Sequence, residues 1–253
     1  MKESIPLQPI LRVENLRKKY VGLDRPWLFE QVTTDVYPND RIALIGVSGQ
    51  GKSTLLRILS RLDKHDDGVL EYSGVSYEQV DPREWRTHIG YVAQQAVMIE
   101  ETVDDNLRLY SSLHQKTYNE ELAHLLLEKV GLSTLDLTQN AKSLSGGEKQ
   151  RIALVRSLLM QPEVLLLDEI TASLDQGSKK RVEELLHDWA DTHQTAMIWV
   201  THDLEQARQV SNRVWFMAQG TLLHDQGSTE FFKYPADDEV ARFLNAAGEG
   251  RNI

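Results

Sequence analysis

The sequence contains no cysteine, which excludes disulfide bonds and thiolate metal sites and fits a reducing compartment. It also lacks any run near the roughly 20 apolar residues that a membrane-spanning helix needs. Residues 1–9 hold no long apolar stretch, so we expect no secretory signal. Positive charge is scarce, because the formal net charge is −10, and this balance disfavours non-specific binding to nucleic acid. If the chain acts at a membrane, we expect another polypeptide to supply the spanning part.

The 253 residues, 41% of them hydrophobic, suffice for one large domain or two small ones. We find no internal repeat, low-complexity tract or long linker. Apolar runs predict strands at 10–16, 27–36, 41–46, 89–93, 164–167, 196–200, 213–218 and 221–224. Apolar residues at helical spacing predict helices at 52–62, 102–109, 118–130, 146–160, 178–190 and 237–244. This mixture predicts an α/β fold.

Residues 46–53 match the pattern G-x-x-x-x-G-K-S between an expected strand and an expected helix, as a phosphate-binding loop requires. The glycines let backbone N–H groups point at phosphate oxygens, and the helix start adds partial positive charge. We expect Lys52 to reach the β- and γ-phosphates and Ser53 to contact Mg²⁺. A glycine turn that merely starts a helix is the competing interpretation. The expected nucleotide-binding residues of this loop are Gly46, Val47, Ser48, Gly49, Gln50, Gly51, Lys52, Ser53 and Thr54.

Two carboxylates follow the apolar run at residues 164–167, which is typical of a parallel strand covered on both faces. We expect Asp168 to hold Mg²⁺ through water, and Glu169 to orient or deprotonate the attacking water. An acidic cap at the start of a helix is the alternative for a lone Asp-Glu pair. The phosphate loop upstream favours the catalytic interpretation.

Between these two motifs, residues 144–150 read Leu-Ser-Gly-Gly-Glu-Lys-Gln and open a helix. The residues that form this second start are Ser145, Gly146, Gly147 and Glu148. A helix N-terminus with two glycines is a further phosphate-binding element, and one nucleotide rarely needs two such ends in a single chain. A helix cap and turn without a ligand is the alternative.

The three motifs together resemble the ATP-binding cassette (ABC) ATPases, and the resemblance runs from Leu11 to about Leu244. It implies a P-loop NTPase fold with a RecA-like parallel sheet, an N-terminal antiparallel β-subdomain and an inserted helical subdomain. It also implies that two subunits pair head to tail, so that Ser145 and its glycines contact ATP held by the partner subunit. ATP and Mg²⁺ are the implied cofactors.

The resemblance assigns further residues in chain order. Gln94 corresponds to the glutamine that contacts Mg²⁺ and the attacking water, with Gln95 as its one-residue competitor. Ser173, Leu174 and Asp175 correspond to the loop that crosses the dimer interface, and His202 to the histidine that contacts the γ-phosphate. The implied catalytic set is therefore Glu169, His202, Gln94 and Lys52, and the implied metal set is Ser53, Gln94 and Asp168.

Adenine needs a flat surface, and in the resembled family an aromatic residue upstream of the phosphate loop stacks on the base. Tyr20 takes this place in the sequence, and Trp27 is the competitor. Either aromatic could instead be an ordinary core residue beside a strand.

The expected organisation is a single ABC domain at 10–247, followed by a tail at 248–253. Residues 10–94 and 145–247 form the ATP-binding core with its β-subdomain, and 95–144 form the helical subdomain. All motifs occur once, so we expect a homodimer or a dimer with a similar ATPase chain. The resemblance also implies a membrane permease partner that docks beside the glutamine loop, with Val97, Met98, Ile99 and Leu107 as candidate lining residues. The chain would then lie peripherally on the cytoplasmic side of the cell membrane.

Within the superfamily, residues 91–107 and 168–175 resemble the iron-export ATPases of the FetA type, although similar sequences are often labelled as phosphate or unspecified transporters. Most relatives carry proline after the Asp-Glu pair, whereas this chain has Ile170. The leading function is therefore an ATP-binding and ATP-hydrolysing subunit that couples ATP-driven dimer closure to solute movement by a separate membrane permease. The FetA resemblance implies export of iron or another metal as the transport that it drives. The alternative is a soluble ABC ATPase that acts on nucleic acid or ribosomes, which the acidic composition disfavours. A P-loop kinase or GTPase would leave the motif at 144–150 unexplained.

Overall fold

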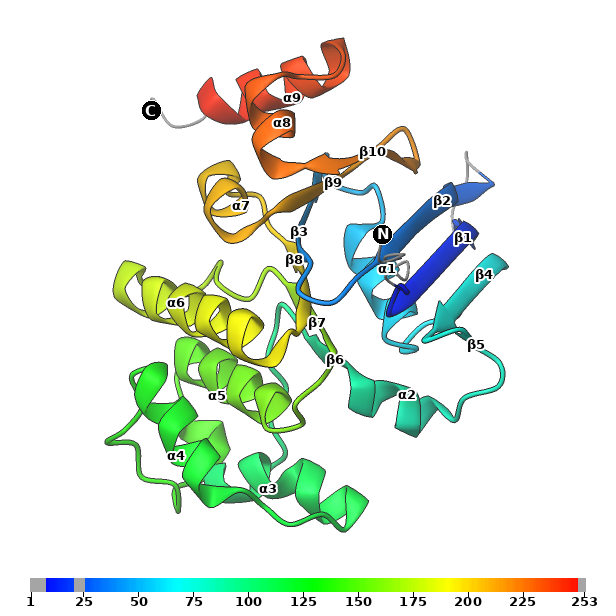
Figure 1. Cartoon of the computed structure of the whole chain (residues 1–253). Coiled ribbons are helices and arrows are strands. Elements are labelled where there is room, and N and C mark those ends of the chain that lie inside the picture. The colour runs from blue at the N-terminus through cyan, green and yellow to red at the C-terminus, as the bar shows by residue number, and fades with distance from the viewer. Residues whose placement is uncertain (1–7, 21–25, 250–253) are drawn as a thin grey trace, which may run out of the picture.

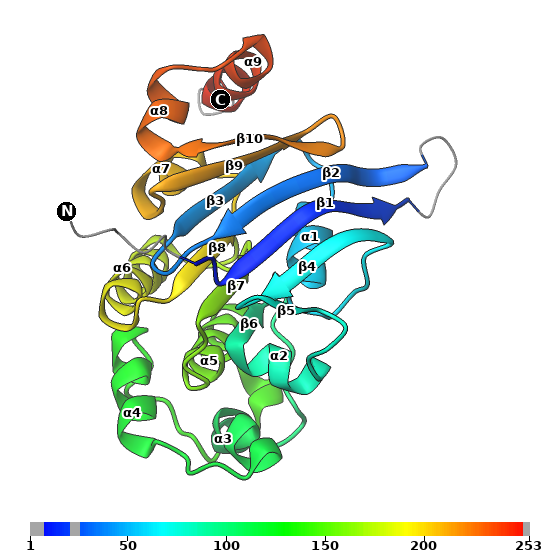
Figure 2. The same ribbon diagram turned by 45° about the vertical axis from the view of Figure 1, so that its right-hand side comes forward.

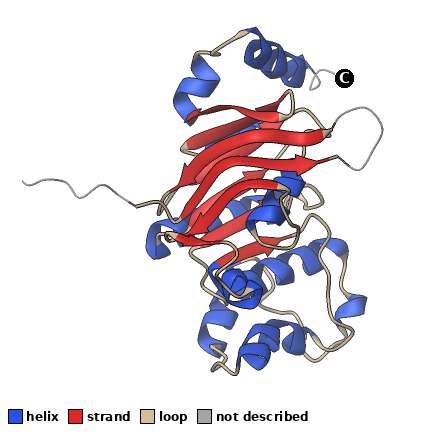
Figure 3. Ribbon diagram, turned by 90° about the vertical axis from the view of Figure 1, so that its right-hand side faces the viewer, coloured by secondary structure: helices blue, strands red, loops and turns tan. Residues whose placement is uncertain are grey.

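The fold is described from a computed structural model in which residues 8–20 and 26–249 are placed. The strands are β1 (Leu11–Lys19), β2 (Trp27–Val36), β3 (Arg41–Gly46), β4 (Asp67–Tyr72), β5 (Val75–Ser76), β6 (Ile89–Val92), β7 (Val164–Asp168), β8 (Ala196–Val200), β9 (Arg213–Ala218) and β10 (Thr221–Gly227). The helices are α1 (Lys52–Leu59), α2 (Pro82–His88), α3 (Val103–His114), α4 (Glu120–Lys129), α5 (Gly146–Leu158), α6 (Gln176–His193), α7 (Leu204–Val210), α8 (Ser228–Lys233) and α9 (Asp238–Glu249). The expected α/β fold is confirmed, with the strands gathered in the middle of the molecule (Figure 3).

The larger sheet has the strand order β10-β9-β3-β8-β7-β6, and neighbouring strands from β9 to β6 run parallel. Leu44 pairs with Val200, Val200 with Asp168, and Leu167 with Val92. In a parallel sheet the carboxyl ends of neighbouring strands meet at one edge. The segments that follow β3, β8, β7 and β6 therefore leave the sheet side by side.

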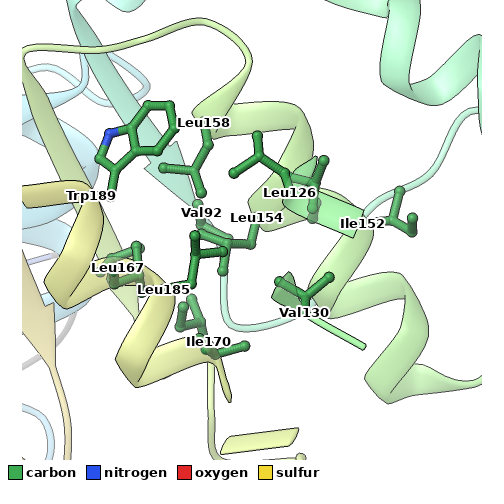
Figure 4. Packing of buried hydrophobic residues seen from close by; sticks show 14 of the residues in the cluster. Val92, Leu126, Val130, Ile152, Leu154, Leu158, Leu167, Ile170, Leu185 and Trp189 are labelled. Carbon is green, nitrogen blue, oxygen red and sulfur yellow. The ribbon is translucent and has the colours of Figure 1, made fainter. Parts of the chain in front are cut away.

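The two faces of this sheet bury alternate residues of the same strands. Leu44, Leu166 and Ile198 pack with α1 and with the smaller antiparallel sheet, whose order is β2-β1-β4-β5. Figure 2 shows α1 lying beside β1, β2 and β4. Leu167 and Trp199 point the other way, into a cluster with α5 and α6 (Figure 4). This period of two explains why the apolar runs of these strands are continuous rather than alternating.

Helices α3 and α4 pack against α5 at the end of the molecule opposite α8 and α9 (Figure 1). Thr102 caps α3 in a reciprocal capping box with Asp105, and Asn119 caps α4. Helix α5 contacts both α3 and β6. The boundary expected at 144/145 therefore falls between helices that pack together, and the division into subdomains stays a proposal.

The element boundaries differ from the expected ones in a few places. Helix α1 ends at Leu59, short of the expected residue 62, and Arg61 takes a left-handed φ of 57°. Helices α2, α7 and α8 were not predicted, because each has only six or seven residues and so carries too few apolar positions for a helical period. Within the described ranges, no helix combines the length and the apolar character needed to cross a bilayer.

Candidate nucleotide site

Four neighbouring strand ends bring the expected site residues to one edge of the larger sheet. The phosphate loop (residues 46–53) follows β3, and His202 follows β8. Asp168 and Glu169 lie at the end of β7, and Gln94 lies just after β6. Segments far apart in the chain therefore meet at this edge (Figure 1), which is the usual place for a ligand in a parallel sheet.

The phosphate loop depends on glycine for its path. Gly46 has a φ of +144°, and a Cβ atom there would lie 2.0 Å from the Met217 backbone oxygen on β9. Gly49 and Gly51 also have positive φ values, of +79° and +91°. Gly51 caps α1 without a side-chain hydrogen bond, so the first N–H groups of the helix point into the loop. Such N–H groups and the helix dipole suit an anion.

Lys52 is buried inside this loop, with a relative exposure of 6%. Its ammonium donates hydrogen bonds to the backbone oxygens of Gly46 and Val47, at 2.9 Å and 3.0 Å. Burial lowers the pKa of Lys52 from its usual value, and the negative charges of Glu169 and Asp168 oppose that shift. The loop therefore holds a cation in its centre, where a phosphate group would be attracted.

Asp168 is 4% exposed, and each of its carboxylate oxygens accepts a hydrogen bond from a hydroxyl group. Ser53 Oγ donates to Oδ1 at 2.9 Å, and the Tyr91 hydroxyl donates to Oδ2 at 2.9 Å. Burial, followed by the Asp168 charge, raises the pKa of Tyr91 well above its usual range, while Arg57 opposes this shift. Tyr91 is therefore a protonated donor at every physiological pH.

Glu169 lies between two polar side chains from the neighbouring strand ends. Gln94 Nε2 donates to one of its carboxylate oxygens at 2.9 Å, and His202 Nε2 lies 2.8 Å from the other. Glu169 also has a left-handed φ of 49°, an uncommon conformation for a residue with a side chain, and one that clusters at functional sites. The carboxylate is therefore held in orientation by two side chains, one at each oxygen.

A buried glutamine links the two loops that carry Glu169 and His202. Gln206 on α7 is 3% exposed, and its amide oxygen accepts from Thr201 Oγ1 at 2.6 Å. Its Nε2 donates to Thr171 Oγ1 at 2.8 Å and to Glu183 Oε1 at 2.6 Å. Because Thr201 precedes His202 and Thr171 follows Glu169 by two residues, this amide holds the two loops at a fixed separation.

The helix start at Ser145 and Gly146 lies on the surface, between the buried side chains of Leu144 and Gln150. Ser145 and Glu148 form a reciprocal capping box, in which the Ser145 hydroxyl donates to Glu148 at 2.7 Å. Ser145 and Gly146 are exposed, and a Cβ atom on Gly147 would lie 3.3 Å from Leu174. Ser173 and Asp175 are also exposed, and Asp175 caps α6. The structure therefore brings two of the predicted interface segments together on one exposed polar surface.

The two candidate adenine-stacking residues differ in their surroundings. Tyr20 is 51% exposed at the end of the first described segment. Trp27 is partly buried, and the cations of Arg17 and Lys19 lie 5.8 Å and 6.0 Å from its ring centre. Tyr20 has the more exposed ring of the two, which suits stacking on a base, so Tyr20 stays the prediction.

The oxygen atoms at this edge fit a magnesium ion. Mg²⁺ prefers oxygen ligands and is usually held by one or two carboxylates together with water and phosphate oxygens. Asp168 and Ser53 supply a carboxylate and a hydroxyl 2.9 Å apart, and Gln94 lies beside Glu169. Among the placed residues, no group of three or more His, Asp or Glu side chains forms a metal site made of protein alone.

The sequence did not reveal Tyr91 or Gln206 as site residues. Tyr91 lies 77 residues from Asp168 in the chain, and Gln206 lies 35 residues from Thr171. A polar side chain at an inward position of a strand or helix is the signal that could have identified them, although it would not have named their partners.

Comparisons with known proteins relate this chain to transport ATPases. The family described as "ABC transporter" matches residues 29–172. An ABC transporter ATP-binding protein of Bacillus subtilis, YjkB, is 35% identical, with 93% of this chain and 94% of that protein covered. The phosphate import protein PstB of Campylobacter jejuni is 35% identical, with coverage of 85% and 91%. The probable iron export protein FetA of Escherichia coli is 34% identical, with coverage of 78% and 87%.

Two solved structures share the fold. A bacterial Atm1-family ABC exporter with ATP bound gives a TM-score of 0.80 at 22% identity, covering 96% of this chain and 42% of that chain. This chain therefore spans less than half the length of that exporter. A dimeric post-hydrolysis state of the ATP-binding cassette MJ0796, bound to ADP and Pi, gives 0.76 at 23% identity, with coverage of 86% and 98%. These similarities confirm the expected fold class.

Proposed function

The chain belongs to the ABC transporter family and is an ATPase of the ATP-binding cassette type, and on this premise we propose that its hydrolysis of MgATP drives a separate membrane permease. Among the expectations from sequence, the family and the ATPase class are confirmed. The finer assignments of residues, dimer, solute and location are proposals, and each is supported by a feature described above.

The observation that carries this proposal is the position of Glu169. Its carboxylate directly follows Asp168 and is held between Gln94 and His202. A carboxylate fixed in this way, facing a phosphate loop with a central lysine, can orient or deprotonate a water molecule that attacks a γ-phosphate. Catalysis of phosphoryl transfer depends mainly on such positioning and on charge stabilisation.

The other residues divide the remaining tasks. The phosphate-loop N–H groups and Lys52 would bind the β- and γ-phosphates, and Tyr20 would stack on adenine. Ser53, Asp168 and Gln94 would hold Mg²⁺, which when bound neutralises charge on the phosphate oxygens. His202 would contact the γ-phosphate while it also orients Glu169. Each of these groups lies at the same edge of the sheet.

The exposed start of α5 supports a head-to-tail dimer. Ser145 and Gly146 are exposed, and the Ser145 N–H donates to Glu148 of the same helix start at 2.8 Å rather than to a ligand. A second copy, or a similar ATPase chain, would place them over ATP in the first subunit. The loop at Ser173–Asp175 lies next to them and would cross the same interface. The capping hydrogen bond of Ser145 to Glu148 would then be exchanged for one to phosphate.

A groove between α2 and α3 supports docking of the permease. It has a volume of about 1160 Å³ and is lined in part by Val97, Ile99 and Leu113. Val97 is 74% exposed, so its apolar side chain is available to a partner at this groove. Of the other candidates named from sequence, Leu107 is 1% exposed and belongs to the main core cluster, and Met98 is partly buried and packs against that cluster. Docking would place the chain peripherally on the cytoplasmic side of the membrane.

The solute is the finest part of the proposal. The resemblance to FetA favours export of iron or another metal, and relatives of similar identity are named for phosphate import and arginine transport. A transport assay with the permease that this chain drives, supplied with each solute in turn, would show which solute is carried. ATPase activity that rises with DNA or ribosomes, and not with a permease, would favour the alternative of a soluble ATPase.

The decisive experiment replaces Glu169 by glutamine. We expect Glu169→Gln to bind ATP, to hydrolyse it at least about 100-fold more slowly, and to accumulate as a closed dimer in size-exclusion chromatography. Glu163→Gln is the matched control, because Glu163 is an exposed carboxylate just before the opposite end of β7. Normal hydrolysis by Glu169→Gln would remove Glu169 from its role and refute the proposal.

A further inference from the structure

Tyr91 occupies a position that the known motifs do not explain. It lies in β6 opposite Leu166 of β7, and side chains two residues apart on a strand share a face. Asp168 is therefore the next β7 residue on the face to which Tyr91 belongs. The tyrosine hydroxyl crosses to Asp168 Oδ2 at 2.9 Å. The register of the two strands thus sets this hydrogen bond.

Asp168 has two hydroxyl partners, and they differ in kind. Ser53 Oγ donates to Oδ1, and this hydroxyl is itself a proposed Mg²⁺ ligand, which would bind the ion through an oxygen lone pair while its O–H group points to Asp168. The Tyr91 hydroxyl donates to Oδ2 from the neighbouring strand β6 and also interacts with Arg57, but it is not a proposed Mg²⁺ ligand. Tyr91 is therefore the partner that would orient the carboxylate without itself contacting the ion.

Tyr91 also lines the groove between α2 and α3. Tyr91 thus contributes to the groove and, through its hydroxyl, to the nucleotide site. The Tyr91 side chain is only partly buried. Among the residues that line this groove, it is the one with a hydrogen bond to Asp168.

We propose that Tyr91 is a positioning residue that fixes the Asp168 carboxylate for Mg²⁺. This inference rests on the proposed function. Groups that orient a metal-binding carboxylate from behind change metal affinity by about 10–100-fold when they are removed. The lower end of that range is expected here, because Asp168 keeps its place at the end of β7.

The test uses Tyr91→Phe, which removes the hydroxyl and keeps the ring in the groove. Equilibrium binding of ATP is measured against Mg²⁺ concentration in the full-length protein carrying Glu169→Gln. We expect half-saturation to need about tenfold more Mg²⁺, whereas ATP binding in EDTA stays the same. In the background with Glu169 intact, kcat at subsaturating Mg²⁺ should fall and recover when Mg²⁺ is raised.

Tyr72→Phe is the matched control. Tyr72 is also partly buried, and its hydroxyl donates to a carboxylate, Glu163 Oε1, at 2.6 Å, away from the nucleotide site. Its loss should leave the Mg²⁺ dependence unchanged. An unchanged Mg²⁺ dependence in Tyr91→Phe, or equal shifts in both variants, would overturn the proposal. If the parent protein binds ATP without any dependence on Mg²⁺, the proposed function itself fails, and this role fails with it.

Discussion

Replacing Gln206 by glutamate changes one amide group into a carboxylate of the same length and shape. In the native protein the Gln206 Nε2 group donates to Glu183 and to Thr171. An ionised glutamate cannot donate, and it would place a second negative charge against Glu183 at a site that is 3% exposed. The Thr171 hydroxyl can turn and donate instead, so the contact with Glu183 carries most of the effect.

The size of the effect has a lower and an upper bound. Loss of a hydrogen bond to a charged group costs about 1.5–3 kcal/mol. The upper bound is the free energy needed to protonate the introduced glutamate, because the protonated carboxyl can again donate a hydrogen bond to Glu183. Taking up a proton at pH 7 costs about 3.7 kcal/mol for a carboxyl whose unfolded pKa is about 4.3, at about 1.36 kcal/mol for each pH unit. We therefore expect Gln206→Glu to lose about 2–4 kcal/mol of unfolding free energy at pH 7.

The pH dependence follows from the proton balance. The introduced carboxyl has a folded pKa above its unfolded pKa, so the folded state binds more protons and its stability falls as pH rises. Between pH 5.5 and pH 7.5 the penalty should grow by up to about 2.7 kcal/mol, at about 1.36 kcal/mol for each pH unit. Acidic pH should therefore restore most of the lost stability.

Urea denaturation at these two pH values measures the effect. Gln209→Glu is the matched control, because Gln209 lies on the same helix, is exposed, and bonds only to the side chain of Glu205 in the contacts described. We also expect kcat of Gln206→Glu to fall with little change in KM for ATP, since the amide holds the loops of Glu169 and His202 and not the phosphate loop. Equal losses in the two variants, or a loss that does not shrink in acid, would refute this reasoning.

Three further predictions concern the nucleotide site and its interface. Gly46→Ala should cost about 4 kcal/mol or more of stability, because backbone strain and a clash of the new Cβ with the Met217 backbone add together. Gly49→Ala should cost about 1–2 kcal/mol, because a Cβ at Gly49 has no atom within 4 Å. Equal losses of stability in urea denaturation would contradict this difference. Ser145→Arg should abolish phosphate release while the monomer still binds ATP, and loss of monomer binding would argue against action on the partner's nucleotide. Hydrogen bonds from Ser145 lower the pKa of Glu148 from 4.5, so the stabilisation they give is present above pH 4.5 and is lost as pH falls through the lower folded pKa. Thermal unfolding at pH 6 and at pH 3.5 should therefore show the advantage of the wild type over Glu148→Gln shrinking in acid, and a constant advantage would count against the capping role.

The parts of the site that could be predicted from sequence are those carried by short contiguous motifs. Residues 46–53 specify a turn and a helix start by themselves, and the run at 164–167 specifies a strand buried on both faces. A parallel sheet then requires their ends to meet. The meeting of Lys52, Asp168 and Glu169 thus follows from local patterns and one topological rule.

The parts that could not be predicted depend on pairs of residues that only the folded chain brings together. Tyr91 reads as an ordinary strand residue until the register places it opposite Leu166. Gln206 lies in a seven-residue helix that carries too few apolar positions to be recognised from its period. Leu107 could have lined the groove or the core, and only packing against α5 decides for the core.

Strand β6 has a consequence for the motions of the site. It is four residues long, and among the described strands it pairs with β7 alone, at the edge of the larger sheet. Strands β3, β8 and β7, which precede Lys52, His202 and Glu169 in the chain, are each paired on both sides. Local opening is cheapest where the fewest backbone hydrogen bonds must break. Amide protons of β6 should therefore exchange with deuterium before those of β3, β8 and β7, and such an opening would carry Tyr91 and Gln94 away from the two carboxylates while the phosphate loop stays folded.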